Sequence, residues 1–173
     1  MFKKEKDTLE SNASKLMSLA LKGGAELAEV CASYGQRTKV TLEKQDFHLA
    51  SSDDGYQFGL RVLKNGRLGF TACNTYESNE LKEIATRALE IASFSLVNPN
   101  WSIQETANLA REAPTHLWDD ALVQTSLQTQ KEWAGLMMQE AVSDKRFRLN
   151  EGSVTNSHQF YLVTNSLGTN KFE

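Results

Sequence analysis

Apolar residues recur at helical spacing in three stretches of the chain. Over residues 8–22 they lie three or four positions apart, and Gly23-Gly24 follows as a stop signal. A second stripe covers residues 78–93, with Ser78 as a suitable N-cap. A third covers residues 126–142, where Thr125 and Gln128 fit a capping box. The pattern predicts three amphipathic helices.

Strand-like runs lie between the first two of these stretches. Residues 28–34 and 38–42 are rich in Val, Thr and Tyr, and Gly35-Gln36 between them predicts a hairpin. Residues 47–50 fit a third strand, and Asp53-Asp54-Gly55 predicts a turn after it.

Asn65-Gly66 is the preferred pair for a two-residue type I′ turn and gives the clearest local signal in the chain. It fixes a register in which Lys64 faces Arg67, Val62 faces Gly69 and Leu60 faces Thr71, with Leu63 opposite Leu68 and Arg61 opposite Phe70 on the other side. Because both faces carry apolar side chains, we expect each to be covered at least in part.

The C-terminal residues 149–173 predict two strands around Asn156-Ser157-His158, followed by a turn at residues 165–168. Residues 95–120 hold both prolines and no sustained period, so we expect a long connector packed by Trp101 and Trp118. The fold class predicted is α+β: an antiparallel or mixed β-sheet built from hairpins, with about three packed helices, in a single domain over residues 1–173.

The composition and net charge of the chain limit the kinds of partner that we expect it to bind. The net charge of -3 provides no basic field for nucleic acid, and the basic clusters at residues 3–6 and 145–148 are short. The N-terminus lacks a signal-peptide pattern, and no run of about 18 apolar residues occurs, so we expect a cytoplasmic protein without membrane contact. Cys31 and Cys73 are expected to be buried free thiols without chemistry.

No constellation of residues predicts catalysis. His48, His116 and His158 lie far apart, without the spacing that places two imidazoles on one helical face around zinc. Ser157 and His158 are neighbours in a strand and point to opposite faces, so they do not form a nucleophile and base.

The paired acids and the glycines also have structural explanations. Asp53-Asp54 precedes a turn glycine, and Asp119-Asp120 lies near a helix start, where Asp suits the backbone. The glycines at 55, 59, 66 and 69 have no phosphate-binding spacing. We therefore predict no catalytic, cofactor-binding or metal-binding residue in this chain.

Three segments, in this order, resemble the N-terminal domain of the TldD/PmbA family, also called modulator of DNA gyrase. They are GGAELAEVCAS at residues 23–33, DDGYQFGLRVLKNGRLGFTACNTYESNELKEIATRALEIA at residues 53–92, and LNEGSVTNSHQFYLVTNSLG at residues 149–168. NEGSVTNSH, with NSLG after it, is more similar to the PmbA branch, also called TldE, than to TldD.

The resemblance implies a role in proteolysis. In this family the TldD-type chain is a zinc metallopeptidase with an HExxxH element in its C-terminal domain, and the PmbA-type chain lacks that element and pairs with it. The family's C-terminal domain is absent from this sequence. We therefore expect a structural or peptide-enclosing subunit in a heterodimer acting on small or unfolded peptides, with zinc in the TldD-type partner.

Two alternatives remain open at the level of sequence. The chain could act as a stand-alone module that binds a protein or peptide through an exposed sheet edge. The older family name also suggests modulation of DNA gyrase, to which the acidic net charge lends no support.

Overall fold

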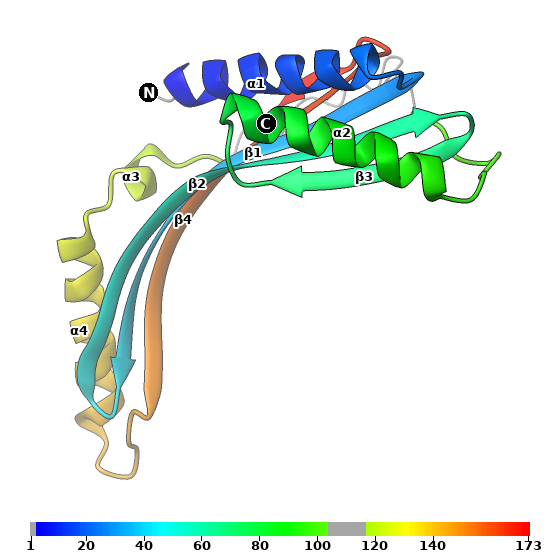
Figure 1. The fold of residues 1–173 in the computed structure, drawn as a ribbon. Coiled ribbons are helices and arrows are strands. Elements are labelled where there is room, and N and C mark those ends of the chain that lie inside the picture. Colours follow the sequence, from blue (N-terminus) through cyan, green and yellow to red (C-terminus); the bar gives the residue numbers. More distant parts are fainter. Residues whose placement is uncertain (1–2, 104–116) are drawn as a thin grey trace. The chain divides into compact units, whose positions relative to one another are not determined.

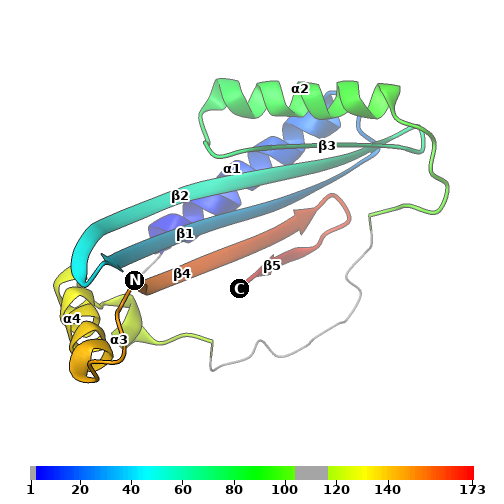
Figure 2. The same ribbon diagram turned by 90° about the horizontal axis from the view of Figure 1, so that it is seen from below.

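The computed structural model describes residues 3–103 and 117–173. They form four helices and a five-stranded antiparallel sheet of order β3-β2-β1-β4-β5 (Figures 1 and 2). This confirms the α+β class. The elements in chain order are α1 (Lys3–Lys22), β1 (Leu27–Glu43), β2 (Asp46–Lys64), β3 (Arg67–Cys73), α2 (Ser78–Phe94), α3 (Asp120–Val123), α4 (Leu127–Ser143), β4 (Glu151–Asn165) and β5 (Asn170–Phe172).

The chain divides into two compact units. Within the described residues, unit 1 comprises 3–34, 55–103 and 160–173, and unit 2 comprises 35–54 and 117–159. The boundaries fall inside β1, β2 and β4, so each of these strands contributes to both units.

Helices α1 and α2 cover one face of the sheet in unit 1 (Figure 1). Both predicted stripes are confirmed, because Leu9, Ala13, Leu16 and Ala20 of α1 and Leu81, Ile84, Ala85, Ala88 and Ala92 of α2 are buried. Opposite them lie the inward residues of two strands, Ala28, Val30, Ala32, Phe58, Leu60 and Val62. Ser78, predicted as the N-cap, is instead the first residue of α2. The N-cap position is Glu77, which makes no side-chain hydrogen bond to the helix, and Ser78 Oγ accepts a hydrogen bond from Lys15 Nζ at 2.6 Å.

The β2–β3 hairpin has the register that Asn65-Gly66 predicts. Lys64 pairs with Arg67, Val62 with Gly69 and Leu60 with Thr71, and both turn residues have positive φ (52° and 68°). The face carrying Leu60 and Val62 is buried. The other face is half-buried at Leu63 and Leu68 and open at Phe70.

Gly69 allows α2 to lie directly on β3. A Cβ added there would overlap the Ala88 carbonyl oxygen and stand 2.9 Å from Ala92 N. Since the obstructing atoms belong to the helix backbone, no side-chain rotation relieves the overlap. The glycine therefore sets the distance between the helix and the sheet.

Helix α4 packs on the strands of unit 2 through a small core. Val40, Leu42 and Ala134 are buried there, and half-buried Leu127, Met137, Met138, Leu149 and Val154 surround them. The predicted stripe is too broad, because Trp133 and Leu136 are 41% and 60% exposed. The N-cap is Ser126, whose Oγ accepts from Thr129 N at 3.0 Å, so the capping box predicted at Thr125 and Gln128 is wrong by one residue.

The hairpin predicted at Gly35-Gln36 is wrong, because β1 runs through both residues without interruption. The chain reverses later, at Lys44 and Gln45, which both have positive φ (50° and 68°). Neither residue type favours that conformation, so composition gave no signal for this turn.

The turn predicted at Asp53-Asp54-Gly55 is also wrong, because all three residues lie within β2. Phe47 lies beside α4, near Gly135, whereas Phe58, Leu60 and Val62 are buried in unit 1. β2 therefore passes through both units as one extended strand, in spite of the turn preference of Asp53-Asp54-Gly55.

Strand β4 is continuous, which corrects the prediction of two strands around Asn156-Ser157-His158. The turn at residues 165–168 is confirmed: Gly168 has φ 92°, and Asn165 Oδ1 accepts from Leu167 N (3.0 Å) and Thr169 N (3.1 Å). Of the predicted connector, residues 104–116 lie outside the described part of the chain. In the remainder Trp101 is half-buried, and Trp118 is 39% exposed with its ring against His158.

Candidate functional site

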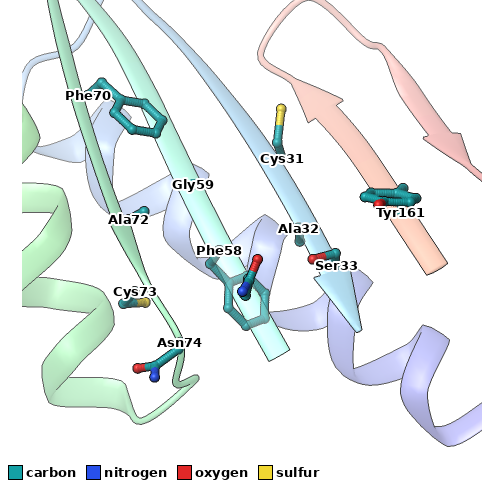
Figure 3. A pocket seen from close by; sticks show the side chains of 11 residues that line it. Cys31, Ala32, Ser33, Phe58, Gly59, Phe70, Ala72, Cys73, Asn74 and Tyr161 are labelled. Atoms are coloured by element: carbon teal, nitrogen blue, oxygen red, sulfur yellow. The ribbon is translucent and has the colours of Figure 1, made fainter. Parts of the chain in front are cut away.

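A hollow of about 620 Å³ opens on strands β1 to β4 of unit 1 (Figure 3). Its lining is mostly apolar or small. The lining residues are Cys31, Ala32, Ser33, Gln57, Phe58, Gly59, Phe70, Ala72, Cys73, Asn74 and Tyr161.

Two exposed aromatic rings flank this hollow. Phe70 on β3 is 53% exposed and Tyr161 on β4 is 52% exposed, with Cys31 of β1 between them (Figure 3). Gly59 makes room for Phe70, since a Cβ on that glycine would lie 3.4 Å from the ring. The arrangement can receive an apolar side chain of a peptide or protein, as aromatic anchors commonly do at interfaces.

Charged groups adjoin the hollow at Glu29 and Arg61, which form an ion pair. The Cys31 thiol beside them is exposed, which corrects the prediction that it is buried. Desolvation by surrounding atoms, and then the Glu29 carboxylate, raise the pKa of Cys31, and Arg61 opposes them. The thiol therefore stays protonated near neutral pH and is not an activated nucleophile. Cys73 is half-buried, and its Sγ donates to Thr75 O at 3.1 Å.

A small polar cavity of about 70 Å³ lies in unit 2, lined by Gln36, Thr38, Val123, Thr125, Asn156 and His158. Beside it, the fully buried Gln130 donates from Nε2 to Thr38 Oγ1 at 2.6 Å. Asn156 Nδ2 donates to Leu122 O at 2.5 Å. These bonds connect α4 and the end of α3 to the sheet, so we assign the cavity to the architecture of unit 2.

His158 packs edge-on against Trp118, with ring centroids 5.9 Å apart. Desolvation lowers the pKa of His158, so its imidazole is neutral at pH 7. Ser157 is exposed whereas His158 is half-buried, as expected for neighbours on opposite faces of β4. The structure therefore does not bring the two together as nucleophile and base.

The remaining candidate residues lie apart from the hollow. His48 is exposed in unit 2, with Nδ1 3.5 Å from a Glu43 carboxylate oxygen. Asp119 caps α3 by accepting from Ala121 N and Leu122 N, which confirms its helix-start assignment, and Asp120 accepts from Trp118 Nε1 at 3.0 Å. Asp53 and Asp54 are exposed on β2, and His116 lies outside the described residues.

The residues that the structure describes do not fit a zinc ion. Across 3–103 and 117–173, no three His, Cys, Asp or Glu side chains gather closely enough to hold a metal. The two described histidines contact Glu43 and Trp118, respectively. We therefore derive no chemical step through zinc in this chain.

Sequence reasoning missed the hollow and the aromatic side chains that flank it. Its residues come from four strands, and Tyr161 is far in sequence from Phe70. No local pattern marks such a surface, because it exists only once the strands pair.

Among the helices of residues 3–103 and 117–173, none has the length and apolar character needed to span a membrane.

A family model described as "PmbA/TldA metallopeptidase domain 1" matches residues 28–92. This range runs from the first buried residue of β1 to the last buried residue of α2. It contains ten of the eleven residues that line the hollow, all but Tyr161. No curated protein sequence matches the chain.

Solved structures share the fold at low sequence identity. TldE from Thermococcus kodakarensis is 21% identical, with a TM-score of 0.81 over 94% of this chain and 36% of its own. A protein described as a proposed modulator of DNA gyrase from Bacteroides thetaiotaomicron is 18% identical, with a TM-score of 0.85 over 100% of this chain and 39% of its own. A similarly described protein from Thermotoga maritima is 16% identical, with a TM-score of 0.68 over 95% and 36%.

The chain thus spans between 36% and 39% of the length of these solved chains. The matched segment includes three strands of the sheet and the helix that packs on β3. Residues 28–92 thus match the first domain of the PmbA/TldA metallopeptidase family, and the chain shares the fold of TldE and of the two proteins described as proposed modulators of DNA gyrase.

Proposed function

We propose that this chain is the N-terminal domain of a PmbA/TldE-like subunit in a TldD/TldE-type zinc metallopeptidase assembly. In this proposal a TldD-type partner supplies the zinc and the hydrolytic chemistry, and the pair acts on small or unfolded peptides in the cytoplasm. The present chain contributes a structural or peptide-enclosing wall and no chemistry of its own.

The observation that carries the proposal is the coincidence of the hollow with the family-matched segment. All but one of its lining residues fall within residues 28–92, so the surface belongs to the domain that the family shares. The likeness to TldE from Thermococcus kodakarensis supports the assignment to that branch. Exposed rings beside small residues suit contact with a peptide or with a partner chain.

Co-expression with a TldD-type subunit tests the proposal. We expect the two chains to purify together and to cleave an unstructured peptide, with activity that needs the TldD-type chain. The present chain alone should be inactive when zinc is added. Zinc-dependent peptidase activity in the isolated chain, or failure of the two chains to associate, would contradict the proposal.

Phe70 tests the hollow itself. Phe70→Asp should reduce complex formation or peptide cleavage by about tenfold or more, because it places a charge where an apolar contact forms. Phe94→Asp provides the matched control, since Phe94 is 90% exposed at the end of α2 and lies outside the hollow. If the two variants behave equally, the hollow is not the surface that contacts the peptide or the partner chain.

A second candidate function, docking of a protein or peptide at a sheet edge, is favoured by the edge of β2. Strand β3 pairs with residues 58–64 of β2, so residues 46–57 have no described strand on that side. Exposed strand edges accept extended segments through main-chain hydrogen bonds. Capture of a defined protein in the absence of any TldD-type subunit would favour this candidate over the first.

A further inference from the structure

The middle of the β2 edge in unit 2, residues 47–52, lacks the side chains that usually protect an edge strand. Natural edge strands usually carry Lys, Pro or inward-pointing charges that block pairing with another chain. Residues 47–52, Phe-His-Leu-Ala-Ser-Ser, contain no Lys, Arg, Asp, Glu or Pro. The Phe47 N–H donates to the Asp46 side chain, at 2.7 Å from Oδ1. A bond to such an exposed carboxylate can be exchanged for one to an incoming carbonyl.

Apolar surface accompanies these main-chain groups. Phe47 and Leu49 are 46% and 57% exposed. The Phe47 ring lies 3.9 Å from the position of a Cβ built on Gly135, so this end of the edge lies beside α4. An added strand would therefore gain apolar contact as well as hydrogen bonds.

The charges at the two ends of this β2 edge determine which kind of strand can pair with it. Asp46 precedes the uncharged run and Asp53 and Asp54 follow it, and all three are exposed. Antiparallel pairing with a second copy, centred on Ala50, would place Asp46 against Asp54, and parallel pairing would oppose identical acids. Like charges placed directly opposite each other destabilise a sheet. A second copy of this edge is therefore disfavoured, whereas a strand with basic ends is favoured.

We propose that residues 46–54 of β2 form a docking edge for an extended segment of another protein that carries Lys or Arg near both ends and apolar side chains at alternate positions between. This inference rests on the second proposed function, docking at a sheet edge, and specifies the edge and the chemistry of its partner. It is independent of the pairing with a TldD-type subunit.

Synthetic peptides test the proposal on the 173-residue chain. The probe alternates Val and Thr and has Lys at both ends; its counterpart has Glu at both ends. Amide chemical shifts of the labelled protein should change at residues 46–54 and in the adjoining part of β1. At low salt we expect the Lys probe to bind roughly tenfold more tightly than the Glu probe. N-methylation of alternate amides in the Lys probe should abolish binding, because it removes main-chain donors.

A charge-reversal pair separates the edge from general electrostatics. Asp53→Lys/Asp54→Lys should reverse the preference between the two peptides, because it replaces both acids at one end. Asp7→Lys/Glu90→Lys changes the net charge equally on exposed positions of α1 and α2 and should leave the preference unchanged.

Each other outcome contradicts a distinct claim. Shift changes at the β2 edge without preference between the probes would overturn this inference and leave the second proposed function, docking at that edge, in place. Shift changes only at a different segment would overturn both. If neither probe binds, both the inference and the second proposed function are overturned. Binding that survives N-methylation would show that strand addition is not the mode.

Discussion

At the scale of single residues, the approach of α2 to β3 depends on Gly69. The position has no side chain, and the backbone of Ala88 and Ala92 occupies the space that one would need. Asn65-Gly66 correctly predicts the pairing of Gly69 with Val62, but no local pattern predicts what lies above the glycine. That requires the position of a helix that follows later in the chain.

Gly69→Ala should lower the free energy of unfolding by about 1–3 kcal/mol, because the added methyl group forces the helix backbone to move. Gly55→Ala is the matched control, since a Cβ there meets nothing within 4 Å. Urea unfolding of both variants measures the difference. Equal stability of the two would mean that α2 does not lie on Gly69 as described.

His158 gives the protein a pH-dependent stability. Its pKa is lowered in the folded state by desolvation, so below about pH 6.5 the unfolded chain binds more protons than the folded chain. The contribution of the neutral His158 imidazole to the free energy of unfolding is retained above that pH and lost as the pH falls through its folded-state pKa.

His158→Gln should therefore reduce the loss of stability between about pH 7 and about pH 5.5. Urea midpoints measured across this range test the expectation, and His48→Gln serves as a control at an exposed histidine of the same unit. An unchanged pH dependence in His158→Gln would contradict the assigned cause.

At the scale of elements, turns with a local chemical signal are predicted from sequence and the others are not. Asn65-Gly66 and Asn165 to Gly168 adopt the conformations that their residue types favour. Gly35-Gln36 and Asp53 to Gly55 permit a turn equally well, but pairing with neighbouring strands keeps both segments extended. Strand continuity is thus set by non-local pairing, and the hollow depends on the same pairing.

The β2–β3 hairpin should be sensitive to its turn. Gly66→Val should lower the melting temperature, at a cost of about 1–3 kcal/mol, because a β-branched residue is strained at positive φ. Gly66 has φ 68°, and an added Cβ would also approach Val97 Cγ1 to 3.2 Å. Gly66→Asn should be better tolerated, since Asn enters this region more easily. Thermal unfolding of both variants decides, and an unaffected Val variant would contradict the assignment.

At the scale of the whole molecule, the two units have cores of very different size. Unit 1 buries a large set of side chains from two helices and the sheet, whereas unit 2 buries Val40, Leu42 and Ala134 with half-buried neighbours. Apolar burial is the main favourable term in folding, so we expect unequal local stability.

Amide hydrogen exchange should reveal this difference. Amides of Val40 and Leu42 in unit 2 should exchange through openings of lower free energy than those of Val30 and Leu60 in unit 1. Mass spectrometry of peptic fragments can separate the two sets. Equal protection would show that the chain opens as one cooperative unit.

The continuity of β1 and β4 through both units has a consequence for synthesis on the ribosome. Ala28 N donates to Ser166 Oγ at 3.0 Å, and Ser166 N donates to Ala28 O at 2.8 Å, across a separation of 138 residues. β1 is translated first, and its second edge therefore stays unpaired until β4 has been synthesised. During that interval the nascent chain carries a bare strand edge, which is the kind of segment that chaperones protect.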